Sequence, residues 1–225
     1  MPNNPRIVLL HGTPVAMVPI QQAFAARWPE AEIVDLLDAS LSIDRAKDHD
    51  LTPRMFERFT ELGGYAHRIG ANGILVTCSA FGPAIARMGQ DLSIPVLKPN
   101  EAMFQAAVGQ GTRLGMLATF APSVLTMTEE FEEFVRESGS HATLKTIVVG
   151  GAMDALRKGD ADTHNKLVAA RAPELADCDA IMLAHFSTSR ALERTSTAVS
   201  TPIITSPASA VDRMRALVNS APQRR

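Results

Sequence analysis

The sequence predicts an α/β protein with two pseudo-symmetric domains, each a four-stranded, mostly parallel sheet flanked by helices. Two observations lead to this prediction. Apolar, strand-like runs alternate with helical segments eight times along the 225 residues, an arrangement typical of parallel sheets that helices cover on both faces. In addition, several features of the first half recur in the second half at one fixed spacing, which indicates an internal repeat.

Short apolar runs between turn residues give the expected strands. These are residues 6–10, 32–36, 74–76, 94–97, 113–118, 144–149, 180–184 and 202–205. Helices are expected between them, and several begin with a proline, whose missing N–H costs nothing in a first helical turn. They are residues 18–27, 53–68, a helix opening at residue 82, 100–108, 122–137, 161–176, 187–199 and 207–219.

The segment 38–51 interrupts the alternation. It is polar, has no periodicity and is long for a connection inside a compact domain. Its Asp44, Asp48, His49 and Asp50 could suggest a metal site, but no ligand spacing repeats, so a solvated, mobile loop is favoured. We expect this loop to cover the site when a ligand is bound.

Four pairs of residues carry the repeat. The pairs are Arg6 and Arg113, Cys78 and His185, Pro95 and Pro202, and Asn100 and Pro207, each 107 positions apart (113 − 6 = 107). Ligands of such sheets bind beyond the carboxyl ends of the strands. Two related domains facing each other would therefore place Cys78 and His185 on opposite walls of one cleft.

Cys78 stands where the buried strand 74–76 stops, and Gly82 and Pro83 open the next helix. A thiol facing a helix N-terminus has a lowered pKa, and the thiolate is its reactive form, so we expect Cys78 to be reactive. A small buried hydrophobe is the alternative. Cys178 precedes its strand and should lie at the opposite end of the sheet, so it receives no role.

The stretch VTCSAFGPAI around Cys78 and the stretch LGMLATFAPS in the second half resemble the aspartate/glutamate racemase superfamily. This superfamily includes amino-acid racemases, hydantoin and allantoin racemases, maleate isomerase and arylmalonate decarboxylase. The resemblance covers essentially the whole chain. It implies a site between two domains, no cofactor, and a last helix that returns to the first domain. The domains implied are 1–99 plus 207–225, and 100–206.

The resemblance also implies catalytic residues. Two-base members of the superfamily carry one cysteine in each half, and Cys78 matches the first. The second position is His185, in LAHFSTS, where racemases typically read Gly-Cys-Thr-Glu. Arylmalonate decarboxylase also keeps one cysteine, but the second-half one. The leading hypothesis is a racemase or isomerase using Cys78 and His185, since a histidine can donate or accept a proton near neutral pH. An arylmalonate-type decarboxylase, a Cys/His hydrolase and a non-enzymatic carboxylate-binding protein stay open.

Removal of a proton next to a carboxylate leaves an enediolate-like carbanion, which needs hydrogen-bond donors for two oxygens. Turns at strand ends and helix N-termini offer such donors. By residue matching, the candidate donors are Ser79 and Ala80 in the first half, and Phe186 and Ser187 in the second. Thr13 and Pro14, with Thr119 and Ser123 at the equivalent turn, would line the cleft as further substrate-binding residues. For Ser123 and Ser187, a role as helix caps is an equally good interpretation.

Charge and composition exclude several classes of binding partner and indicate the cellular compartment. The net charge is −2 and there is no basic patch, so nucleic acid is not an expected partner. No apolar run reaches the length of a membrane span, the start lacks the features of a signal peptide, and two cysteines make no disulfide framework. We therefore expect a cytoplasmic protein that binds no metal. The resemblance implies a small carboxylate or hydantoin-like substrate, and a homodimer stays open. His164, on the helix capped by Asp160, is expected to be solvated.

Overall fold

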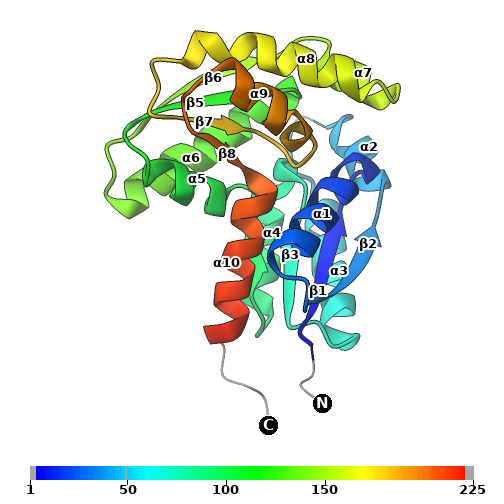
Figure 1. The fold of residues 1–225 in the computed structure, drawn as a ribbon. Helices are drawn as coiled ribbons and strands as arrows, with labels where there is room; N and C mark the ends of the chain where they lie inside the picture. The colour runs from blue at the N-terminus through cyan, green and yellow to red at the C-terminus, as the bar shows by residue number, and fades with distance from the viewer. Residues whose placement is uncertain (1–3, 49, 221–225) are drawn as a thin grey trace. The chain divides into compact units, whose positions relative to one another are not determined.

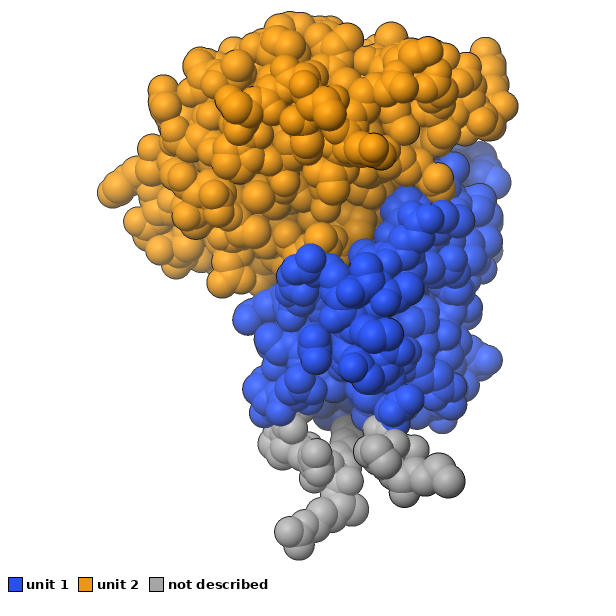
Figure 2. Space-filling view, viewed as in Figure 1, with its two compact units in different colours: residues 1–99, 210–225 blue, residues 100–209 orange. Residues whose placement is uncertain are grey.

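The computed structural model describes residues 4–48 and 50–220. The chain divides into two compact units, residues 1–99 with 210–225 and residues 100–209 (Figure 2). Each unit contains one four-stranded parallel sheet flanked by helices, which confirms the predicted fold class. In the part of the chain described, no helix combines the length and the apolar character needed to cross a bilayer.

The sheet of the first unit has the strand order β2-β1-β3-β4, with every neighbouring pair parallel (Figure 1). Its strands are β1 (Arg6–His11), β2 (Glu32–Leu37), β3 (Gly73–Val76) and β4 (Val96–Leu97). Its helices are α1 (Met17–Arg27), α2 (Ser40–Arg45), α3 (Pro53–Arg68) and α4 (Gly82–Asp91), with short 3₁₀ turns η1 (Pro14–Ala16) and η2 (Ser79–Phe81). The last helix, α10 (Ser206–Ser220), contributes to this unit from Ala210 onward.

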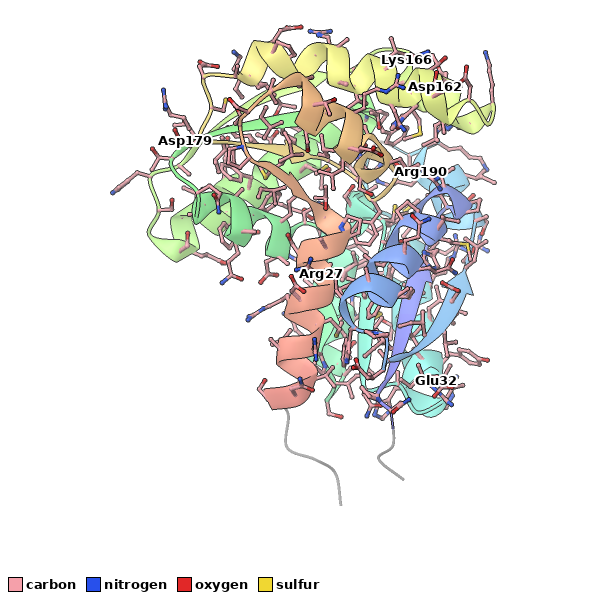
Figure 3. All side chains as sticks on the ribbon, viewed as in Figure 1. Arg27, Glu32, Asp162, Lys166, Asp179 and Arg190 are labelled. Atoms are coloured by element: carbon pink, nitrogen blue, oxygen red, sulfur yellow. The ribbon has the colours of Figure 1, made fainter. Side chains whose placement is uncertain are left out.

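Helices pack on both faces of this sheet, which explains why residues 7–10 of β1 and all of β3 are buried and free of polar side chains. Phe59 on α3 and Phe81 form a tilted ring pair, 5.0 Å between centroids, within the same cluster as the strand residue Val8. Elsewhere in the sheet, a Cβ atom built on Gly73 would lie 2.6 Å from the sulfur of Met214, so α10 lies very close to β3. Arg27 on α1 is hydrogen bonded to Asp212 on α10, with 2.7 Å between Nε and Oδ1 (Figure 3).

The second unit repeats this arrangement with the order β6-β5-β7-β8 (Figure 1). Its strands are β5 (Arg113–Ala118), β6 (Thr143–Val148), β7 (Ala180–Leu183) and β8 (Ile203–Thr205). Its helices are α5 (Glu101–Val108), α6 (Val124–Ser138), α7 (Ala152–Arg157), α8 (Ala161–Arg171) and α9 (Leu192–Ala198), with 3₁₀ turns η3 (Ala121–Ser123), η4 (Ala172–Leu175) and η5 (Ser187–Ala191).

The strand registers confirm the internal repeat. Ile7 pairs with Gly73 in the first sheet, and Leu114 pairs with Ala180 in the second, both members being 107 positions further on. The same offset relates the β3–β4 and β7–β8 pairings. The offset of 107 does not hold for β2 and β6, because β6 begins 111 positions after β2 (143 − 32 = 111). The difference lies in the connecting helices, since α1 has 11 residues and α6 has 15.

The prediction of a structureless loop at 38–51 is wrong, because α2 occupies its middle. Leu41 on α2 is buried in the core of the first unit. Arg58 on α3 is ion-paired with Asp38 and, at 2.8 Å, with Asp44. Of the residues considered for a metal site, His49 lies outside the described residues. Closure of this segment over a ligand stays a prediction.

His164 is also corrected, because its side chain is fully buried. It lies on the inner side of α8 with Val168 and Ala169, and its Nδ1 is 2.8 Å from Oδ1 of Asn165. The predicted cap of this helix is confirmed, since the Asp160 carboxylate accepts a hydrogen bond from the backbone N–H of Thr163 at 3.0 Å.

The sequence pattern did not predict α7, a helix of six residues.

Replacing Arg58 with glutamine is expected to loosen α2, because Arg58 holds Asp38 and Asp44 at the two ends of this short helix. Local opening should then become more frequent, and trypsin should cleave after Arg45 or Lys47 roughly fivefold faster. Arg54→Gln is the matched control, since Arg54 lies exposed on the same helix α3. Equal cleavage rates in Arg58→Gln and the wild type would show that α2 is held by other contacts.

Candidate functional site

Cys78 lies between β3 and the turn η2, at the carboxyl edge of the first sheet. Its backbone is extended, with φ −119° and ψ 118°, and α4 begins four residues later at Gly82. The residue is partly exposed as a whole, and its side chain packs against the apolar cluster that includes Val76 and Phe81. The predicted order of strand, thiol, turn and helix is therefore present.

The predicted low pKa of this thiol is wrong. Burial raises the pKa of Cys78, and three groups act in the opposite direction without outweighing it: the N–H of Ala80, the hydroxyl of Ser42 and the charge of Arg45. The setting beside a helix start thus does less than the loss of solvent around the sulfur. The resting form at neutral pH is the protonated thiol, which can donate a proton.

Backbone and α2 both approach the thiol closely. A Cβ atom on Gly12 would lie 3.4 Å from the sulfur of Cys78 and 3.2 Å from Oγ of Ser42. Ser42 donates a hydrogen bond to the carbonyl of Gly12 at 2.5 Å. The absence of a side chain at position 12 therefore makes room for the thiol and for α2.

A buried polar network lies immediately beside Cys78, and sequence reasoning missed it. His11, at the end of β1, is fully buried. Its Nε2 is 2.8 Å from Oδ1 of Asp35, and its Nδ1 is 2.9 Å from Oγ1 of Thr77. Burial lowers the pKa of His11, and the hydrogen bond and charge of Asp35 offset this only in part. The neutral ring therefore donates from Nε2 to the carboxylate and accepts from Thr77. A histidine ending an otherwise apolar strand was the only signal for it.

His185 occupies the equivalent position in the second unit, directly beyond β7 and Ala184. Within residues 4–48 and 50–220 it is the one non-glycine residue with a positive φ, of 70°. Its Nε2 is 2.5 Å from Oγ of Ser123, and its Nδ1 is buried without a hydrogen-bond partner among the described residues. A left-handed backbone costs free energy, and such strain concentrates at functional sites.

Burial lowers the pKa of His185 to about 4, with the carbonyl of Ala184 acting weakly in the opposite direction. The imidazole is therefore neutral at pH 7. Ser123 also donates towards the carbonyl of Phe120, at 2.9 Å, and its side chain makes no cap for α6. The side chain of Ser123 is therefore hydrogen bonded to His185 and does not cap the helix.

The remaining candidates divide between the two carboxyl edges. In the first unit, Thr13 is partly exposed, Pro14 is exposed, Ser79 is buried and Ala80 is partly exposed. In the second unit, Thr119, Phe186 and Ser187 are buried, and the side chain of Ser187 caps no helix. Oγ1 of Thr119 lies 3.0 Å from Oγ1 of Thr188, a residue that sequence reasoning missed. Where these side chains are buried, the hydrogen-bond donors that the turns can offer to a ligand are backbone N–H groups.

A cavity of about 270 Å³ opens in the second unit beside Thr119. Residues following β5 and β6 line it, together with α7, and Arg157 lies over the ring of Phe120 at 5.6 Å from the centroid. The lining contains one side chain of each charge, Arg157 and Asp154. Across the described ranges, no group of three His, Cys, Asp or Glu side chains is arranged to hold a metal ion.

Comparison with known proteins gives a likeness in structure alone. No protein-family model matches the sequence, and no curated protein is similar to it. Aspartate racemase of Picrophilus torridus superposes with a TM-score of 0.74 at 12% identity, over 98% of this chain and 96% of that chain. Allantoin racemase of Klebsiella pneumoniae gives 0.70 at 16% identity, over 99% and 95%. A glycine-to-cysteine mutant of arylmalonate decarboxylase gives 0.67 at 16% identity, over 98% and 96%.

The chain therefore shares its fold with these two racemases and with arylmalonate decarboxylase, which is the fold that the sequence resemblance implies. The superposed structures include both racemases and a decarboxylase. At these identities the likeness concerns the fold, and the reaction has to be argued from the residues themselves.

Proposed function

We propose that this protein is a cofactor-independent racemase or isomerase that moves a proton at the carbon next to a carboxylate or a hydantoin carbonyl. One observation carries the proposal: the same strand-end position holds a thiol, Cys78, in one half and an imidazole, His185, in the other. Their resting forms are complementary, because the thiol is protonated and the imidazole is neutral. The fold supports the proposal, since racemases share it.

We propose further that the two residues act on opposite faces of the substrate. The imidazole of His185 accepts the proton from the α-carbon, and the electron pair of the broken C–H bond moves into the carboxylate as an enediolate. The thiol of Cys78 then gives its proton to the other face of that carbon. This leaves an imidazolium and a thiolate, which are the forms needed to convert the opposite enantiomer.

The enediolate oxygens need donors that are in place before the proton moves. Backbone N–H groups of the turns after β3 and β7 are suited to this role, since both turns lie at carboxyl edges. They belong to Ser79, Phe186 and Ser187, while the N–H of Ala80 donates to the sulfur of Cys78. We assign Thr13, Pro14, Thr119 and Ser123 to the lining of the substrate site, with Ser123 also holding His185 in place.

An arylmalonate-type decarboxylase is the second candidate, and the ring of His185 favours it. Nε2 is bonded to Ser123 and Nδ1 is buried, so a proton can reach this ring only if its contacts change. A decarboxylase needs no second base. Carbon dioxide leaves with cleavage of the C–C bond, the electron pair stays as an enediolate, and the thiol of Cys78 protonates the α-carbon from one face.

Replacing His185 with asparagine separates the two reactions. A two-base racemase should lose two-sided racemisation, and exchange at one face can persist because Cys78 still removes and returns a proton there. A decarboxylase should keep the handedness of its product with a modest change in rate. The measurement is deuterium incorporation from heavy water, with the enantiomeric outcome, across small carboxylates and hydantoins.

His141→Asn serves as the control, since His141 is an exposed histidine of the same unit. Undiminished racemisation in His185→Asn would remove His185 from the mechanism and leave it as a structural residue.

A further inference from the structure

We infer that Ser42 and Arg45, on α2, are positioning residues that hold the Cys78 thiol and the turn after it in their reactive arrangement. The inference rests on the proposed role of Cys78 in proton transfer. Its test measures the reactivity of the Cys78 thiol, so the substrate does not have to be known.

The first step is that α2 is anchored where it can act on the thiol. Leu41 is 1% exposed and belongs to the core cluster against which Cys78 packs. Arg58, whose side chain is 18% exposed, is ion-paired with Asp38 before the helix and Asp44 within it. These contacts hold α2 at the carboxyl edge of the sheet.

The second step concerns Ser42. Its hydroxyl donates to the carbonyl of Gly12, and the missing side chain at Gly12 leaves both Ser42 and the sulfur next to that backbone. The same hydroxyl can rotate to donate to the sulfur once the proton has left. A hydrogen bond from Ser42 accordingly acts to lower the pKa of Cys78.

The third step concerns Arg45. Its Nε donates to the carbonyl of Ala80 at 3.2 Å, and its Nη1 donates to the carbonyl of Asp48 at 2.6 Å. The N–H of Ala80 is itself a hydrogen-bond donor to Cys78. Arg45 therefore fixes the residue whose amide faces the sulfur, and its positive charge favours the thiolate.

The charges around the thiol support this assignment. Arg45, from α2, is the charged side chain whose field acts on the thiol. On the side of β1, Thr77 is hydrogen bonded to the neutral His11, and His11 is hydrogen bonded to the carboxylate of Asp35. Because the proposed reaction passes through a thiolate, groups that stabilise the thiolate lower the barrier to donating the proton.

Alkylation by iodoacetamide across a pH series tests the inference, with Cys178 as an internal reference thiol in the same molecule. We expect Ser42→Ala and Arg45→Gln each to slow alkylation of Cys78 at pH 7 by about threefold to tenfold, because a pKa rise of one unit lowers the thiolate fraction tenfold. Arg45→Lys keeps the charge but loses the planar donor, so its effect should be smaller. Lys47→Gln removes a charge from the same segment and should change nothing.

Unchanged alkylation of Cys78 in both Ser42→Ala and Arg45→Gln, at every pH, would overturn the inference. If Arg45→Gln does not fold, Ser42→Ala and Arg45→Lys decide it. Slower alkylation without α-proton exchange on any substrate would support the positioning role while contradicting the proposed function, so the two failures are distinguishable.

Discussion

Replacing Cys78 with alanine is expected to slow the incorporation of a solvent proton at the α-carbon by about a hundredfold to ten-thousandfold, the usual cost of losing a general acid or base. The reason is the same for both candidate reactions, since racemase and decarboxylase each need the thiol to protonate the carbanion. Deuterium incorporation from heavy water, followed by mass spectrometry across small carboxylates and hydantoins, measures the effect.

Cys178→Ala is the matched control for this variant. Cys178 lies two residues before β7 begins, at the end of the strand opposite to His185, and should be dispensable. Full activity in Cys78→Ala would contradict the whole assignment. Another group would then have to protonate the α-carbon.

Acidification from pH 7 to pH 4 is expected to lower the free energy of unfolding by about 3 kcal/mol through His185 alone. The pKa of His185 is about 4 in the folded protein, against 6.5 for an ordinary histidine. Below pH 6.5 the unfolded chain therefore binds a proton that the folded chain does not. The stabilisation is complete above pH 6.5 and is lost progressively as the pH falls towards 4. His11 and His164, whose pKa values are also lowered by burial, act in the same direction.

Urea unfolding at pH 7, 5.5 and 4.5 measures this dependence. His185→Asn should flatten the curve, because asparagine has no proton to bind in this range. His141→Asn, which replaces an exposed histidine, should leave the curve as in the wild type. An identical pH dependence in His185→Asn and the wild type would show that His185 is not the group that titrates.

The repeat could be predicted from the sequence because strand register preserves spacing. Cys78 and His185 keep the offset that also relates Arg6 to Arg113, and buried parallel strands are apolar along their whole length. The helix α2 could not be predicted, since its stability comes from contacts with a distant segment. Leu41 is buried in the core of the first unit, and Arg58, which is ion-paired with Asp38 and Asp44, lies on the next helix.

The site was predictable in its location and less so in its chemistry. The motif around Cys78 indicated a thiol at a strand end, but its pKa depends on how closely Gly12 and α2 pack against it. The left-handed backbone of His185 and its hydrogen bond to Ser123 are tertiary features without a local pattern. Likewise, His11 meets Asp35 only because β1 and β2 lie side by side.

The extra length of α6 over α1 has an evolutionary consequence. Both helices start at equivalent positions, 107 residues apart, and the additional four residues amount to about one turn. A whole turn lengthens a helix without rotating its apolar side away from the sheet. After a duplication, each half could therefore change the length of its outer helices turn by turn, while the strand ends that carry Cys78 and His185 kept their places.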